Sequence, residues 1–150
     1  MTLSNKDWML LAIEEAVKAK SLNEVPVGAV VVRENQVIGR GHNSVIRNNS
    51  IAAHAEINAI NKASKTLNNY RLLNCDLYIT LEPCHMCAKA IVDARIKNVY
   101  FAALEPKTGS IISVDNFFDK NFLNHKVNYF SGLMQQESSK LLKDFFLERR

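Results

Sequence analysis

The feature that most constrains the fold is a pair of short motifs that only tertiary structure can bring together. The first holds His54 and Glu56, and the second places Cys84 and Cys87 in the order Pro-Cys-His-Met-Cys. Two thiolates and one imidazole fill three corners of a tetrahedral zinc site and leave the fourth for water, as in a catalytic rather than a closed structural site. The chain must therefore fold so that these two segments meet at one metal ion.

The local structure expected for each motif favours that meeting. Cys84 and Cys87 are three residues apart, so on a helix predicted over residues 84–94 their thiols lie on one face. The partly positive helix N-terminus favours thiolates there. His54 stands near the start of a helix predicted over residues 53–65, and helical side chains lean toward the N-terminus. We expect the two helix starts to face the same point.

A count of charges explains why a carboxylate stands beside the ligands. Zn²⁺ with two thiolates and a neutral imidazole has no net charge, so it acidifies its water less than a site with three neutral ligands. Glu56, two residues from His54, would remove the proton of that water and later return a proton to the leaving group. A Cys-x-x-Cys motif alone also fits a redox pair or half of a structural zinc site, but a structural site has no use for Glu56.

The other cysteine and histidines are not expected to bind the metal. His85 lies between the two cysteines and points off their common face, whereas His42 and His125 have no partner at a suitable spacing. Cys75 stands alone before a strand and is expected to be a small buried apolar residue. Three cysteines with this spacing indicate metal binding rather than a disulfide framework, which favours a reducing cytoplasm.

Alternating helices and strands predict a layered α/β/α domain with a mixed five-stranded sheet. A capping box at Ser4 and Asp7 opens the first helix, and Pro83 suits the first turn of the third. The predicted helices cover residues 5–20, 53–65, 84–94 and about 133 to 150, and the predicted strands cover residues 27–33, 36–41, 77–81, 99–103 and 126–130.

Composition is that of one folded domain over residues 1–150. Apolar residues make up 47% and charged residues 23%, and no Pro-rich linker divides the chain. The longest apolar stretch, residues 25–32, is too short for a bilayer, which needs about 20 residues. The net charge of +4 is mild. Lys140, Lys143, Arg149 and Arg150 gather near the C-terminus, but on charge alone a solvated helix face is favoured over a nucleic-acid site.

His-x-Glu with Pro-Cys-x-x-Cys is the signature of zinc nucleobase deaminases. Nearly the whole chain resembles the bacterial tRNA-specific adenosine deaminases of the cytidine deaminase-like superfamily, on residues 25–30, 54–56, 69–72, 81–84, 107–109, 124–125 and 145–150. Cytidine and guanine deaminases share the zinc motif, whereas residues 69–72 and the C-terminal ending favour the tRNA enzymes.

The resemblance implies a homodimer with one zinc ion per subunit that converts the wobble adenosine of a tRNA anticodon stem-loop to inosine. A zinc-bound hydroxide would attack the purine C6, while Glu56 carries protons to the ring nitrogen and to the leaving ammonia. The backbone N–H of Cys84 would help to hold the attacking oxygen. The amide of Asn43 would hold the base edge, although a loop-capping hydrogen bond is an alternative role for it.

The resemblance also implies a set of RNA contacts: Glu105, Lys107, Asn124, Phe145, Phe146, Arg149 and Arg150. Aromatic and Arg surfaces suit splayed loop bases, and because Phe145 and Phe146 are adjacent on a helix, one is expected in the core. Three positions depart from the family: Glu105 usually is Asp, Lys89 usually is Gly, and His85 usually is apolar. The first departure puts the contact expected at Glu105 in question, and the other two could alter the dimer face or the local charge.

Two other functions remain open from the sequence. One is the same chemistry on a free base or nucleoside, such as guanine or cytosine. The other is a non-catalytic, zinc-stabilised RNA-binding protein. Deamination of free guanine or cytosine, with no inosine formed in an anticodon stem-loop, would favour the first. A protein that keeps its zinc but turns over no purine or pyrimidine would favour the second. For an enzyme, Glu56→Ala is expected to keep fold and metal and to lose nearly all turnover.

Overall fold

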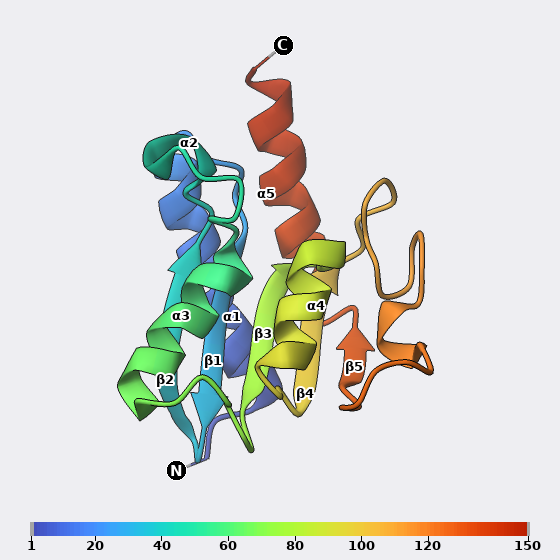
Figure 1. Cartoon of the computed structure of the whole chain (residues 1–150). Coiled ribbons are helices and arrows are strands. Elements are labelled where there is room, and N and C mark those ends of the chain that lie inside the picture. Colours follow the sequence, from blue (N-terminus) through green and yellow to red (C-terminus); the bar gives the residue numbers. More distant parts are fainter. Residues whose placement is uncertain (1, 150) are drawn as a thin grey trace.

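Five strands form one mixed sheet in the order β2-β1-β3-β4-β5 in the computed structural model, which describes residues 2–149 (Figure 1). The strands are β1 (Gly28–Arg33), β2 (Gln36–His42), β3 (Asp76–Leu81), β4 (Asn98–Ala103) and β5 (Asn128–Ser131). The helices are α1 (Asn5–Ser21), α2 (Val45–Asn48), α3 (Ala55–Leu67), α4 (His85–Asp93) and α5 (Gln135–Leu147), with a 3₁₀ turn, η1, at Phe117–Asp119.

The strand directions bring several loops to one edge of the sheet. β1 runs antiparallel to β2 and β3, whereas β4 runs parallel to β3 and β5. The turn between β1 and β2 places Glu34 and Asn35 in the left-handed region, at φ 51° and 61°, as tight hairpin turns require. The carboxyl ends of β2, β3 and β4 therefore share one edge with the start of β1.

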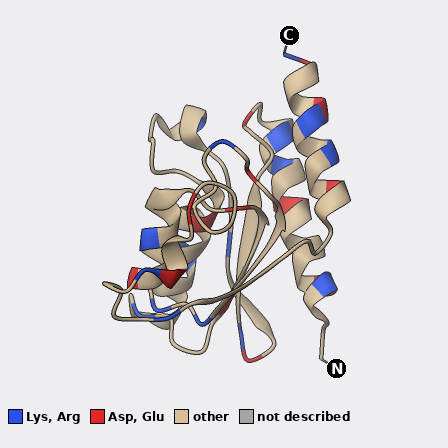
Figure 2. Cartoon of the chain, turned by 90° about the vertical axis from the view of Figure 1, so that its right-hand side faces the viewer, with Lys and Arg blue, Asp and Glu red and all other residues tan. Residues whose placement is uncertain are grey.

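Helices cover both faces of the sheet. In Figure 1, α3 and α4 lie in front of the sheet and α1 lies behind it, and Figure 2 shows α1 and α5 side by side. Alternate strand residues face opposite layers. Val31 and Ile79 pack in the cluster with α3 and α4, whereas Val30 and Tyr78 pack with Trp8 of α1. The predicted α/β/α layering is confirmed.

Glycines in β2 let α3 lie against the strand without an intervening side chain. A methyl group at Gly41 would overlap the carbonyl oxygen of Ala55, and one at Gly39 would overlap the carbonyl oxygen of Ala59. Ala55 is the first residue of α3. The backbone of β2 thus fixes the start of α3.

Most predicted elements are present, and the errors lie at their ends. The first helix has its predicted capping box. The helix predicted over residues 53–65 begins two residues later, because His54 is its extended N-cap. Pro83 lies before α4 rather than in its first turn, because Cys84 is the N-cap.

At the C-terminal end, two further predictions were wrong in their bounds. The last strand is Asn128–Ser131 rather than residues 126–130. α5 covers Gln135–Leu147, so it neither includes Leu133 nor reaches residue 150. Helix α2 and the turn η1 were not predicted, because elements this short carry little periodic signal. Within residues 2–149, none of the helices has the length and apolar character of a bilayer-spanning segment.

Candidate metal centre and active site

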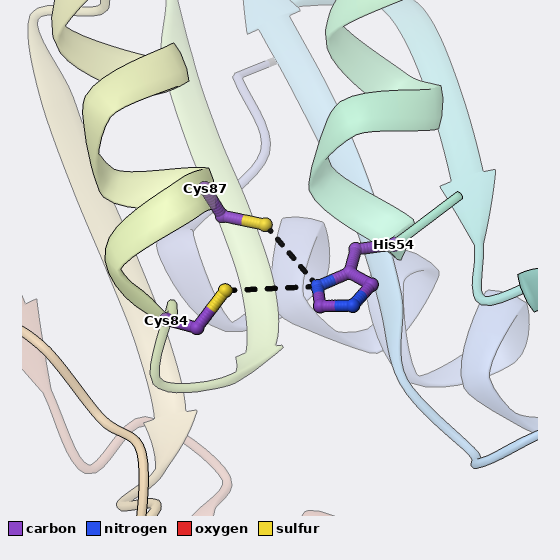
Figure 3. A group of neighbouring side chains, drawn as sticks. All are labelled: His54, Cys84 and Cys87. Carbon is purple, nitrogen blue, oxygen red and sulfur yellow. Dashed lines mark hydrogen bonds between the residues drawn. The ribbon is translucent and has the colours of Figure 1, made fainter. Parts of the chain in front are cut away.

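His54, Cys84 and Cys87 meet between the starts of two helices (Figure 3). His54 is the N-cap of α3, Cys84 is the N-cap of α4, and Cys87 lies in the first turn of α4. The His54 Nδ1 atom is 3.7 Å from Cys84 Sγ and 3.3 Å from Cys87 Sγ. The predicted meeting of the two motifs is therefore confirmed.

These distances fit a tetrahedral zinc ion. With Zn–S bonds of about 2.3 Å and a Zn–N bond of about 2.0 Å, tetrahedral angles put sulfur and nitrogen about 3.6 Å apart. Among the described residues, the group of possible ligands has these three members, all with ligand atoms within 4.8 Å of one another. Two soft thiolates and one imidazole suit zinc, and three protein ligands leave one corner for a small molecule.

The two thiols share a proton unequally in the metal-free protein. A hydrogen bond from the Cys87 thiol lowers the pKa of Cys84 to about 4, and the same hydrogen bond together with burial raises the pKa of Cys87. The hydrogen bond with Cys84 also raises the pKa of His54. Because metals bind thiolate and neutral imidazole, zinc binding would release the protons held by this group.

Glu56 lies in the first turn of α3 and is 4% exposed. Burial raises the pKa of Glu56 to about 7, where a carboxyl group both accepts and donates a proton readily. The side chain lines the same pocket as His54 and Cys84. A buried carboxyl group therefore lies in the pocket beside two of the possible metal ligands.

The pocket is assembled from five segments at one edge of the sheet. Apolar walls come from Val25 and Val27 before β1, and from Leu81 at the end of β3. Polar groups come from Asn43 after β2, and from Glu105 with its neighbour Thr108 after β4. An apolar slot with a few polar groups is typical of a site that holds a flat ring and reads its edge.

Asn43 has the capping role that the sequence left open for it, and it also lies at the pocket. Its side-chain oxygen accepts a hydrogen bond of 2.8 Å from the backbone N–H of Ala55, so it caps the start of α3. The residue also lines the pocket. The capping bond uses the oxygen, and the amide nitrogen remains a donor that can face a ligand.

The remaining histidines and the third cysteine lie outside the metal group. Cys75 is buried, and burial raises its pKa to about 11. Each of the other histidines has a different partner: His42 Nδ1 lies 3.3 Å from Glu15, His85 Nε2 lies 3.0 Å from Asp115, and His125 Nε2 lies 2.8 Å from the Ile96 carbonyl oxygen.

Comparison with known proteins agrees with this site. The model of the MafB19-like deaminases matches residues 3–150. The chain is 48% identical to a tRNA-specific adenosine deaminase of Haemophilus influenzae, over 97% of this chain and 85% of that protein. It is 44% identical to that of Aquifex aeolicus, over 97% and 96%. The chain belongs to the tRNA-specific adenosine deaminases.

Solved structures place this deaminase in the predicted fold. A structure from studies of A-to-I editing by tRNA:A34 deaminases is 43% identical, with a TM-score of 0.89 over 92% of this chain and 100% of that chain. A guanine deaminase from Nitrosomonas europaea is 23% identical, with a TM-score of 0.81 over 97% of this chain and 86% of that chain, which shows a shared fold alone. The cytidine deaminase-like fold is thus confirmed.

Sequence reasoning missed the role of Glu82 in this deaminase. Its buried carboxylate accepts hydrogen bonds from the backbone N–H groups of Glu105, Ile111, Ile112 and Ser113, at 2.7–3.1 Å, and from the Ser113 hydroxyl. Burial alone would raise the pKa of Glu82, but these hydrogen bonds outweigh it and hold the pKa below its usual value.

Glu82 therefore anchors the loop that forms one wall of the pocket. The fit is close, because a methyl group at Gly109 would overlap the Glu82 carboxylate. The available sequence signal was an acidic residue between an apolar strand and Pro83, where no solvated loop is expected. Its partners lie more than twenty residues away, so the sequence alone did not reveal them.

Two of the residues expected to contact RNA lie at or beside the pocket. Glu105 lines it, and its carboxylate accepts the backbone N–H of Lys107 at 3.0 Å. Lys107 is exposed on the same loop. The longer Glu105 side chain, in place of the usual Asp, is thus held toward its own loop.

The C-terminal helix separates its two phenylalanines as expected. Phe145 is 4% exposed and Phe146 is 54% exposed. The Arg149 guanidinium lies 3.5 Å from the centre of the Phe145 ring, and it donates to the Phe145 carbonyl and to Asn23 Oδ1. Arg149 covers Phe145, so only Phe146 offers a free ring in this conformation.

Asn124 lies away from the pocket of its own chain. Its side-chain oxygen accepts a hydrogen bond of 3.0 Å from Arg95, which follows the C-terminal end of α4. Cys84 and Cys87 stand at the opposite end of that helix. Arg150, the last of the expected RNA contacts, lies outside the described residues.

Proposed function

We propose that this protein deaminates adenosine hydrolytically to inosine at the wobble position of a tRNA anticodon. The observation that carries the proposal is the three-ligand group with a buried Glu56 at its open side. The substrate follows from relatives, since tRNA-specific adenosine deaminases match this chain at 40–48% identity. In the reaction, water adds to C6 of the purine, the C6–N bond breaks, and ammonia leaves.

His54, Cys84 and Cys87 would hold one zinc ion in each subunit. When bound, zinc supplies a water molecule acidic enough to act as a nucleophile near neutral pH. Glu56 would accept one proton from the attacking water and deliver it to the adjacent ring nitrogen. It would then take up the second proton, from the hydroxyl group formed on C6, and donate it to the departing amine. Burial raises the pKa of Glu56, which favours a carboxyl group that can both take up and return a proton.

Two further groups would orient the substrate. The Asn43 amide nitrogen donates to an acceptor on the base edge, while its oxygen keeps the cap of α3 in place. The backbone N–H of Cys84, at the partly positive start of α4, stabilises negative charge on the incoming oxygen. Both groups belong to backbone segments that also carry the metal ligands or cap the helix that follows one. The same segments would therefore position the substrate and the metal ligands.

For the RNA, we propose contacts from the rim of the pocket outward. Lys107 faces phosphate, Phe146 stacks on a base, and Glu105 contacts the nucleotide nearest the pocket. Phe145 and Arg149 would contribute as one unit, and Arg150 would extend the basic end. Asn124, at the far end of α4, would contact RNA bound mainly by another subunit.

We further propose that the enzyme is a cytoplasmic homodimer. Exposed apolar side chains flank α4, with Ile112 at 48%, Val114 at 56% and Phe122 at 72% exposure. Burying them against a second copy would remove an apolar patch from water. Sedimentation velocity at micromolar concentration tests this proposal, and a monomer would overturn it. Unpaired thiols and a tRNA substrate suit the reducing cytoplasm.

The deciding experiment incubates the zinc-loaded protein with anticodon stem-loops that differ only in the wobble nucleotide. Ammonia release and inosine in the adenosine stem-loop are expected, with no reaction when the wobble nucleotide is guanosine. Turnover of free guanine or cytosine, with none on the stem-loop, would identify a free-base deaminase instead. A protein that retains zinc and binds the stem-loop but converts no base would be a non-catalytic RNA-binding protein.

A further inference from the structure

A basic groove lies on the other side of the short segment of residues 42–44 that follows β2 and supplies Asn43 to the active-site pocket. It has a volume of about 400 Å³ and is lined by the end of β2, by α2 and by α3. Arg47, Lys62 and Lys65 supply its charge, and Asn58 and Asn61 are among its uncharged polar groups. Among the described residues that line it, none is Asp or Glu.

The three cations of this groove are exposed and not neutralised within the chain. In the part of the chain that the structure describes, none of Arg47, Lys62 and Lys65 forms an ion pair, whereas Lys89 and Lys140 each pair with an aspartate. Two acidic groups near the groove already have partners. Glu15 faces Lys18, Arg40 and His42, and Glu24 accepts the backbone N–H groups of Ile46 and Arg47.

Three positive charges around one groove attract an anion whose negative charges are spread over a similar distance. Lys62 and Lys65 are one turn apart on α3, so their ammonium groups lie along the same side of the groove. The Asn61 side-chain amide, which also lines the groove, can donate to phosphate oxygens. A second copy of the chain is a poor occupant, because symmetric contact through this groove would bring like charges together.

The groove is fixed in position relative to the reacting base. Asn43 lines the active-site pocket, whereas its neighbours His42 and Ser44 line the groove. Asn58 Nδ2 donates to the His42 carbonyl at 2.8 Å and to Ser44 Oγ at 3.0 Å. A strand that leaves the pocket over this wall meets the groove directly.

We propose that this groove binds the phosphate backbone of the RNA strand flanking the adenosine that is deaminated. The inference rests on the proposed function and extends it, because none of the groove residues is among the RNA contacts that the family resemblance implies. Arg47, Lys62 and Lys65 contribute charge and position the strand, and they carry no base specificity. Their contribution is therefore strongest at low salt and equal for all flanking sequences.

The test removes the two lysines of α3 and compares them with two matched lysines elsewhere. The double variant Lys62→Ala/Lys65→Ala is set against Lys6→Ala/Lys97→Ala, two exposed lysines that do not line the groove and that form no ion pair within residues 2–149. Zinc-loaded proteins are titrated with a fluorescent adenosine stem-loop over a range of salt concentrations. For the groove variant, we expect the slope of log K against log salt to become shallower by roughly 1–1.5.

At about 150 mM salt, the KM for the stem-loop should rise roughly tenfold in the groove variant. A Lys62→Arg/Lys65→Arg variant, which keeps both charges, should restore the slope and the KM. The Lys6→Ala/Lys97→Ala control should match the wild type in both. This pattern would separate phosphate binding from a merely structural role of α3, which the arginine variant would not rescue.

Equal slopes in wild type and groove variant would overturn the proposal. A change of sedimentation coefficient in the groove variant, with an unchanged slope, would also overturn it and assign this face to a protein contact. Turnover tests the proposed function separately. A wild type that converts no stem-loop adenosine, while the groove variant still loses its salt slope, would reject the activity and keep the groove as an RNA site.

Discussion

At the scale of single residues, Glu56 differs from an ordinary carboxylate because the fold buries it beside the metal ligands. It is the second residue of α3, two residues after the N-cap His54, so the turn that presents a ligand also presents the proton carrier. Burial lifts its pKa to about 7, and a neutral proton donor is therefore available near physiological pH. The residue's chemistry depends on the pocket more than on the motif.

Replacing Glu56 by Gln removes the proton carrier and keeps its volume. We expect inosine formation to fall by roughly 10²–10⁴-fold, with zinc content and melting temperature retained, since an amide tolerates burial and no ligand is changed. The rate is measured on the stem-loop, zinc by elemental analysis, and melting by circular dichroism. Glu14→Gln, an exposed position on α1, is the control. A rate within about twofold of wild type would exclude Glu56 from proton transfer.

Glu82 is a structural counterpart to Glu56, a buried carboxylate kept ionised by hydrogen bonds. In a Glu82→Gln variant one oxygen is replaced by an NH₂ group that faces backbone donors. We expect a loss of about 2–4 kcal/mol in the free energy of unfolding near neutral pH, measured by urea denaturation. Glu137→Gln, which is exposed, should change stability little.

The pH dependence of that loss has a defined sign. Because the folded pKa of Glu82 lies below the usual 4.5, its stabilisation is present above that value and disappears as the pH falls through the folded pKa. The stability difference between wild type and Glu82→Gln should therefore shrink in acid. A difference that stays constant down to about pH 3 would contradict an ionised Glu82.

At the scale of elements, the site depends on how closely α3 lies on β2. Gly41 faces the first turn of α3, and the carbonyl oxygen of Ala55 occupies the space that a Cβ would need. The same turn carries His54 and Glu56, and Asn43 caps it from the end of β2. Displacing this contact moves a ligand, a proton carrier and a substrate group together.

Gly41→Ala should therefore affect both stability and metal binding. Backbone atoms cannot move aside as flexible side chains do, so we expect a loss of about 2–3 kcal/mol or more, together with weaker zinc affinity. Gly132→Ala is the comparison. It sits at φ 97°, where an added Cβ would meet the Gln135 side chain at an ordinary contact distance of 3.8 Å, so its cost should be about 1 kcal/mol with no effect on zinc. Equal zinc affinity in wild type and Gly41→Ala would show that α3 is positioned by other contacts.

At the scale of the whole molecule, the metal site joins two segments that the sheet alone holds apart. α3 and α4 lie on the same face, and their starts are linked by His54, Cys84 and Cys87 (Figure 3). A ligand that binds only the folded state stabilises it in proportion to the logarithm of its concentration over Kd. Zinc binding should thus stabilise the folded protein as well as support the reaction.

Chelation of zinc should abolish turnover and lower the melting temperature by roughly 5–10 °C. Adding zinc back should restore both, and affinity should fall in acid as the thiolates and the imidazole become protonated. Cys87→Ser should lose the response to chelator, whereas Cys75→Ala should keep it, because Cys75 is outside the ligand group. Chelator-resistant turnover with no bound metal would contradict a metal-dependent mechanism.

Much of this site could be predicted because its information is local. The sequence itself shows two cysteines three residues apart, a histidine two residues before a glutamate, and apolar residues that recur with helix or strand periods. None of these signals depends on how the rest of the chain folds. The same reasoning located α1 and the hairpin, but it put Pro83 inside α4. A proline before an N-cap and one in a first turn have the same sequence signature, and only the hydrogen bonds of the helix distinguish them.

The residues and their spacing were enough to predict which atoms could bind a metal, which residue could carry protons, and the order of helices and strands. Tertiary structure alone decided that Glu82 holds the pocket loop, that Phe145 is covered while Phe146 is free, and that Arg47 joins Lys62 and Lys65 in one groove. The physical reason is the distance along the chain over which each kind of interaction acts. Periodicity and ligand chemistry act over a few residues, whereas burial, hydrogen-bond partners and summed charge depend on segments that the folded chain brings together.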